Sequence, residues 1–264
     1  MKYKLLSLLL LLSFPAYAQT SASVFIEDMT WMEVRDKITS GANVAIIPIG
    51  GTEQSGPHMA TGKHNFIVRQ AAGEIARAVG GTLVAPVIPY SPSGRIYPPE
   101  GHMQFAGTLS MRAETLAMII EDVATSLKQH GFRLICLIGD NAGSQNVQQQ
   151  VAERLNNSWA SQGVQVLHVS SYGDMNMVRR WADANGSMAV DPIAHAGVTE
   201  TSELMSVSPQ HVRTNLIGTY SERDYRSTGS TGDASQSSAA FGRGVLGAKI
   251  NAAVGQIKLA ASKP

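Results

Sequence analysis

The stretch NVAIIPIGGTEQSGPHMATGKHN, residues 43–65, joins an apolar run to a loop rich in glycine and polar side chains. Its first part, Val44–Ile49, has the β-branched and apolar content of a buried strand. A glycine pair follows, and Glu53, His58 and His64 come soon after it. Carboxylates and imidazoles that follow a buried strand are typical of an active-site loop in an α/β protein.

The alternation of short apolar runs with longer helical patterns continues along the chain. Each apolar run is bounded by glycine or proline, and each helical pattern is long enough to cross back over a sheet. We therefore expect an α/β fold, a single-domain three-layer α/β/α sandwich with a mostly parallel sheet. The candidate strands are Val44–Ile49, Thr82–Val87, Leu134–Ile138 and Val164–Val169, and the candidate helices are Thr30–Thr39, Asn65–Val79, Arg112–His130, Ser144–Gln162 and Ala234–Leu259.

Residues 1–18 have the pattern of a secretory signal peptide. Two lysines precede the apolar run Leu5–Leu12, and the small residues Ala16 and Ala18 mark a cleavage site. The apolar run is too short to anchor the chain in a bilayer. We expect residues 19–264, about 245 residues, to form one exported domain. Its expected location is periplasmic or secreted, with no membrane association after cleavage.

Charge and cysteine content exclude several classes of function. Lysine plus arginine number 21 and aspartate plus glutamate 20, so the formal net charge is +1. The sequence has no basic run interleaved with aromatics, which argues against nucleic-acid binding. The single cysteine, Cys136, lies in the apolar run RLICLIG and cannot form an internal disulfide. We expect it to be a small buried hydrophobe rather than a nucleophile.

Polar segments follow the predicted strands at the places where parallel α/β folds bind ligands. Carboxylates and imidazoles recur in these segments, in numbers sufficient for one divalent ion and an acid/base group. Besides residues 50–65, the segments are PPEGHMQFAGTLSM (98–111), GDNAGSQN (139–146) and DPIAHAGVTETSELM (191–205).

From spacing alone, two alternatives to a metal site remain open. The spacing of Glu53, His58 and His64 matches no standard helical zinc motif, so ordinary polar loop residues explain it as well. A serine hydrolase is the other alternative, because GDNAGS has the strand–turn–helix setting of a nucleophile elbow. Its nucleophile position is Asn141, however, which cannot attack, and Ser144 is better explained as a helix N-cap.

Four segments match the signatures of a known enzyme family, in the correct structural places. PIGGTEQSGPHMATGKH (48–64) aligns without a gap with P-x-G-S-x-E-Q-H-G-P-H-L-P-x-x-T-D. HAGVTETS (195–202) matches H-A-G-x-x-E-T-S at every specified position. GDNAGS (139–144) falls on N-G-H-G-G-N, and GHMQFAGT (101–108) on E-H-x-x-F-P-G-T. The chain therefore resembles the creatininase (creatinine amidohydrolase) family from about residue 30 to 255.

The resemblance implies an α/β sandwich with a usually binuclear metal site, often assembled as a homohexamer, that hydrolyses non-peptide C–N bonds. Its residue roles carry over unevenly. The retained family residues are Glu53 and Glu200 as ligands, His195 as acid/base, and His58. The changed ligand positions are Ser55 and Asn141, both histidine in the family, and His64, where the family has a bridging aspartate. Because a neutral imidazole offers one lone pair to one metal, His64 argues against a binuclear site.

We therefore predict one divalent ion per subunit, either zinc, manganese or iron. It would bind in a site whose ligands differ from those of the family. The predicted ligands are Glu53, His64, Glu200 and His58, and the predicted catalytic residues are His195 and Glu200. By family analogy, the substrate-binding residues are Ser55, His102, Gly107, Asp140 and Asn141.

The predicted function is hydrolysis of a non-peptide C–N bond by a metal-activated water. The expected partner is a small-molecule substrate, either a cyclic amide or a formamide, with a lactone as a further option. The alternative is a metal-free periplasmic binding or scaffold protein that kept the fold and lost catalysis. A homo-oligomer, a hexamer by family analogy, is the expected assembly.

Overall fold

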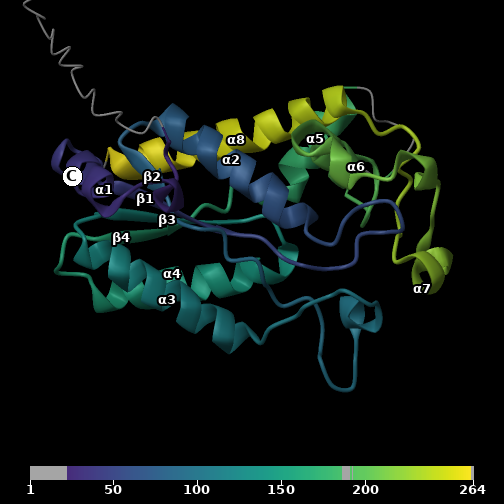
Figure 1. Ribbon diagram of the computed structural model, residues 1–264, viewed down its shortest axis with the longest axis horizontal. Coiled ribbons are helices and arrows are strands. Elements are labelled where there is room, and N and C mark those ends of the chain that lie inside the picture. The colour runs from purple at the N-terminus through teal and green to yellow at the C-terminus, as the bar shows by residue number, and fades with distance from the viewer. Residues whose placement is uncertain (1–22, 186–190, 192, 263–264) are drawn as a thin grey trace, which may run out of the picture.

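A parallel four-stranded sheet forms the middle layer of the molecule (Figure 1). The computed structural model describes residues 23–185, 191 and 193–262, so the predicted signal peptide lies outside the described residues. The strands lie in the order β2-β1-β3-β4, and each pairs in parallel with its neighbour. Their bounds are Val44–Ile49 for β1, Thr82–Val84 for β2, Leu134–Gly139 for β3 and Gln165–His168 for β4.

Helices cover both faces of the sheet, which confirms the predicted three-layer α/β/α sandwich (Figure 1). On one face lie α2 (Lys63–Val79) and α8 (Ala239–Ala261), and on the other α3 (Ala113–Gln129) and α4 (Gln145–Ser158). The remaining helices are α1 (Trp31–Thr39), α5 (Met175–Ala184), α6 (Val198–Val207) and α7 (Tyr225–Thr228). In the described part of the chain, no helix combines the length and the apolar character needed to cross a membrane.

The strands divide the hydrophobic core into two halves. Successive side chains of a strand point to opposite faces of the sheet. Ile46 and Cys136 therefore pack with α2 and α8, whereas Ile47 and Ile135 pack with α3 and α4. Cys136 is fully buried, and burial raises the pKa of its thiol above the ordinary value. This confirms the prediction that Cys136 is a core hydrophobe.

Where predicted boundaries differ from the structure, the causes are local. β2 ends at Val84 rather than Val87, because Pro86 has no N–H to donate to the ladder. α8 begins at Ala239 rather than at residue 234, because Ser238 Oγ accepts a hydrogen bond from the first turn and caps the helix there. Three short helices, α5, α6 and α7, were not predicted from the sequence.

Replacing Ile46 with alanine is expected to lower the free energy of unfolding by about 2–5 kcal/mol, because truncating a fully buried side chain leaves a cavity. Urea unfolding followed by circular dichroism measures this loss. Met118→Ala on α3, where the side chain is 55% exposed, is the control and should cost less than about 0.5 kcal/mol. Equal losses in the two variants would contradict the assignment of Ile46 to the core.

Candidate active site

A cavity of about 520 Å³ opens at the carboxyl ends of the strands. Its lining comes from the loops after β1 and β3, from the segment after β2 and from the segment that leads into α6. Seven of the residues singled out from the sequence line it, namely Glu53, His64, His102, Asp140, Asn141, His195 and Glu200. The fold thus gathers at one site side chains that are far apart in the sequence.

A close backbone approach shapes the loop after β1. A Cβ on Gly50 would lie only 2.0 Å from Asn65 Oδ1, so the position accepts no larger residue without a rearrangement. The same Asn65 oxygen accepts a hydrogen bond of 3.0 Å from the backbone N–H of Gly51. The first turn of α2 is therefore tied to the start of the loop, and this brings His64 against Glu53.

His64 bridges two carboxylates. Its Nε2 lies 3.1 Å from Glu53 Oε1, and its Nδ1 lies 2.7 Å from Asp140 Oδ2. Burial, and then Lys63, lower the pKa of His64, but the hydrogen bonds and charges of Asp140 and Glu53 outweigh them and raise it to about 9. The ring is therefore protonated at neutral pH, and both of its nitrogens donate. In this state His64 has no lone pair to offer a metal ion.

Glu53 is an ionised carboxylate held in a fixed orientation. Its Oε2 accepts hydrogen bonds of 2.8 Å from Ser93 Oγ and of 2.8 Å from Asn141 Nδ2. Burial opposes ionisation, but the hydrogen bond and charge of His64 outweigh it and hold the pKa of Glu53 well below its usual range. His102 Nε2 lies 3.9 Å from the same Oε2, across the cavity mouth.

Gln54 orients two cavity histidines. Its Oε1 accepts a hydrogen bond of 3.2 Å from Gly56 N, which leaves its Nε2 2.7 Å from His102 Nδ1 and 3.2 Å from His195 Nε2. The rings of His102 and His195 lie 4.6 Å apart between centroids. Burial, and then the charge of Lys63, lower the pKa of His195 to about 4, so its ring is neutral at neutral pH.

Glu200, in the first turn of α6, is paired with a buried lysine. Lys63 Nζ lies 2.5 Å from Glu200 Oε2, and the Lys63 side chain is 0% exposed. The same oxygen accepts a hydrogen bond of 2.7 Å from the N–H of Ala196, a residue with a left-handed φ of 55°. Burial opposes the negative charge, but Lys63 outweighs it and lowers the pKa of Glu200 to about 2. This carboxylate is already neutralised within the protein.

Three predicted site residues lie outside the lining of this cavity, among the residues that the structure describes. Ser55 is buried, and its Oγ lies 3.4 Å from the backbone oxygen of Glu53. His58 is also buried, with its Nε2 2.8 Å from Thr201 Oγ1, and burial lowers its pKa to about 4. Gly107 lies in the 98–111 segment with a φ of 89°. The functional roles predicted for these three residues stay predictions.

The sequence analysis missed the buried lysines of the site. Lys63 stands where the quoted family signature has threonine, directly before the altered bridging position, and this departure was a signal. Lys249 comes from α8, and its Nζ lies 3.0 Å from Asp140 Oδ1 and 3.0 Å from Glu203 Oε1. No nearby motif marks Lys249, because only the packing of α8 against the sheet brings it to the site.

The serine-hydrolase alternative finds no support in the geometry of Ser144. The residue is fully buried, and its hydroxyl donates to the backbone oxygen of Asn141 (2.7 Å) and accepts from Gln148 Nε2 (2.9 Å). The predicted side-chain cap of α4 is wrong for the same reason, because the hydroxyl is already engaged inside the turn.

Glu53, His102 and His195 form a candidate metal centre. Each offers one ligand atom, and these atoms lie within 4.8 Å of one another. One carboxylate oxygen with two imidazole nitrogens is a donor set that suits zinc, manganese or iron. The donor set therefore fits one divalent ion. Of the four ligands predicted from the sequence, Glu53 belongs to this group, whereas His64 and Glu200 are paired with other side chains.

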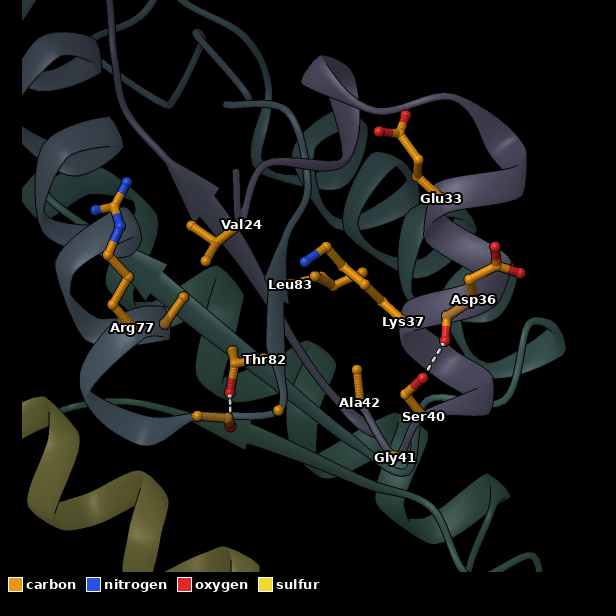
Figure 2. Close-up of a pocket in the computed structure, with 13 residues that line it drawn as sticks. Val24, Glu33, Asp36, Lys37, Ser40, Gly41, Ala42, Arg77, Thr82 and Leu83 are labelled. Carbon is orange, nitrogen blue, oxygen red and sulfur yellow. Dashed lines mark hydrogen bonds between the residues drawn. The ribbon is translucent and has the colours of Figure 1, made fainter. Parts of the chain in front are cut away.

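A second cavity of about 520 Å³ lies at the opposite end of the sheet, where Lys37 extends across it from α1 (Figure 2). Its hydroxyl groups are engaged locally. Ser40 Oγ donates to the backbone oxygen of Asp36 (2.8 Å). Thr82 Oγ1 donates to that of Gly80 (2.7 Å). Because parallel α/β sheets bind ligands at the carboxyl ends of their strands, we place the active site at the first cavity.

The fold and the site together define a three-layer α/β/α protein with a candidate metal centre at the carboxyl ends of a parallel sheet. The profile of the family "Creatininase: Creatinine amidohydrolase" matches residues 27–257. The chain therefore belongs to the creatininase family, as the signatures predict.

Individual relatives agree with this assignment. The mycofactocin precursor peptide peptidase of Mycobacterium ulcerans (strain Agy99) is 30% identical over 184 residues, which cover 65% of this chain and 61% of that protein, so less than two thirds of its length is matched. The creatinine amidohydrolase of Pseudomonas putida is 28% identical over 198 residues, covering 73% and 75%. A solved manganese form of creatininase has the same fold, with a TM-score of 0.71 at 24% identity over 91% of this chain and 100% of that chain.

The protonation of His64 predicts a pH-dependent stability. Its folded pKa of about 9 lies above the unfolded value of 6.5, so the stabilisation is complete below pH 6.5 and is lost as pH rises through 9. The contribution is on the order of 3 kcal/mol. Urea unfolding in EDTA between pH 6 and about 9.5 should show this loss in the wild type and not in His64→Gln. Parallel pH dependences in the two proteins would refute the assignment.

Proposed function

We propose that the protein is an exported hydrolase that cleaves a non-peptide C–N bond in a small cyclic amide or formamide, or the ester bond of a lactone. The observation that carries this proposal is the group of ligand atoms from Glu53, His102 and His195, within 4.8 Å of one another beside the polar cavity. A cavity of about 520 Å³ is within the usual range for a small-molecule site. Family membership supports the reaction class.

One divalent ion per subunit, zinc, manganese or iron, would be held by Glu53, His102 and His195. When bound, it would supply a Lewis acid that activates water and polarises the carbonyl group of the substrate. The manganese form of creatininase supports a metal in this fold. His102 Nε2 lies 3.9 Å from Glu53 Oε2 and is the ring nitrogen that would hold the ion beside this carboxylate.

The protein side chains around the centre hold its donors in position. Ser93 and Asn141 fix Glu53 Oε2, and the charge of His64 keeps that carboxylate ionised. The neutral ring of His195 either donates its lone pair to the ion or accepts a proton from water, the role predicted from the sequence. If His195→Ala retains zinc but loses hydrolysis, His195 has the proton-transfer role. If the variant loses zinc, His195 is a ligand.

The alternative function, a metal-free binding or scaffold protein, is favoured by one observation. Two of the ligands predicted from the sequence, His64 and Glu200, are already neutralised by side chains of the protein. Metal content separates the two functions.

Protein purified without chelator is expected to contain about one equivalent of zinc, manganese or iron per chain, as a three-ligand catalytic centre would. His102→Ala should lose the metal. His130→Ala, a change of an exposed histidine at the end of α3, is the matched histidine control and should keep it. Wild-type protein that is metal-free, and equally stable with and without EDTA, would refute the metal-dependent function. Hydrolysis by the loaded protein is then assayed on a panel of lactams, formamides and lactones.

We also propose cleavage after Ala18, a periplasmic or extracellular location and assembly as a homo-oligomer, a hexamer by family analogy. The support is the charged and apolar pattern of residues 1–18 together with the family resemblance. Mass spectrometry of the exported protein should find a mature chain that begins at Gln19, and light scattering should give a multiple of the chain mass. An uncleaved chain would contradict the signal peptide, and a monomer would contradict the homo-oligomer.

A further inference from the structure

The pairing of Glu200 with Lys63 has a consequence for metal stoichiometry. Lys63 is the first residue of α2, and its side chain is fully buried. A cation in the first turn of a helix is opposed by the helix dipole, so helix stability does not explain its position. The ion pair of 2.5 Å between Lys63 and Glu200 explains why a lysine stands at this position. A metal ion bound to this oxygen of Glu200 would have to displace a fully buried ammonium group.

His64, the residue after Lys63, stands where the family signature has the bridging aspartate. The family signature has a carboxylate here that bridges two ions, whereas His64 donates one hydrogen bond to Glu53 and another to Asp140. A second ion would lose the bridging oxygens and meet in their place an imidazole whose two nitrogens already face Glu53 and Asp140. Ser55 and Asn141, which replace two family histidines, add only neutral and weak donors, and Asn141 is already bonded to Glu53.

The charge balance points the same way. Four carboxylates and two lysines gather at the site, namely Glu53, Asp140, Glu200 and Glu203 with Lys63 and Lys249. One divalent ion at Glu53 balances these charges when all four carboxylates are ionised. A second divalent ion would leave two positive charges without partners, which is strongly unfavourable where side chains are buried.

We infer that Lys63 and His64 occupy the place of a second metal ion, so that this site binds one divalent ion where a binuclear site would bind two. The inference deepens the proposed function, and it rests on that function only for the ion at Glu53, His102 and His195. What is new is that no further ion binds at Glu200 and the bridging position. Two side chains of α2 carry out that exclusion.

The test counts zinc ions. EDTA-treated mature protein is dialysed against excess zinc, and zinc per chain is measured by elemental analysis. Wild type is expected to bind no more than about one zinc. The double variant Lys63→Thr/His64→Asp, which restores the residues of the family signature, is expected to bind about one more than wild type. Lys63→Thr alone frees Glu200 and should raise the affinity for this additional zinc at least about tenfold.

Lys258→Thr, a change of an exposed lysine on α8, is the charge control and should leave the zinc count unchanged. Circular dichroism establishes that each variant is folded, and the single variant keeps the test decisive if the double variant does not fold. Two zinc ions in wild type would overturn the inference, as would folded variants that bind no more than wild type. Wild type with no zinc would instead refute the metal at Glu53, while the difference between variant and wild type still tests the exclusion.

Discussion

The hydrogen bonds of His64 to Glu53 and Asp140 are the interaction on which the site depends. They connect the loop after β1, the first turn of α2 and the end of β3 through one buried ring. In a binuclear relative, metal ions would join these segments. Here a protonated side chain joins them, so the site can keep its shape without any ion. The stability of the fold and the chemistry of the site are therefore less tightly coupled than in an enzyme whose metals hold the loops together.

The buried charges form a connected set rather than separate pairs. Asp140 contacts both His64 and Lys249, and Lys249 in turn contacts Glu203. Tyr172 adds a hydrogen bond of 2.9 Å to Asp140 Oδ1. Removal of any one member leaves a charge of the opposite sign in a low-dielectric environment, and this makes buried networks costly to change one residue at a time.

The sequence allows the fold and the location of the site to be predicted, but not the ionic partners. Val44–Ile49 and the other buried strands are recognisable from their apolar runs, and the loop signatures identify Glu53, His195 and Glu200. Local pattern says nothing about Lys249, which reaches Asp140 only because α8 packs on the sheet beside α2. The state of His64 was likewise beyond prediction, since the two carboxylates that stabilise its protonated ring come from different loops. His102 was predicted to be a substrate-binding residue, and only the folded geometry places it among the candidate ligands.

The position of Lys249 on the last helix affects the order in which the molecule assembles. Synthesis proceeds from the N-terminus, so β1, α2 and β3 are available before α8 has been made. Until α8 packs, Asp140 lacks one of its two cations, and Glu203 lacks its only partner in the described charge network. The polar centre is therefore electrostatically incomplete during synthesis and gains these ion pairs when the C-terminal helix docks. A chain that is truncated before α8 would leave Asp140 and Glu203 without Lys249. An incomplete chain therefore differs from a complete one in the charge of its polar centre.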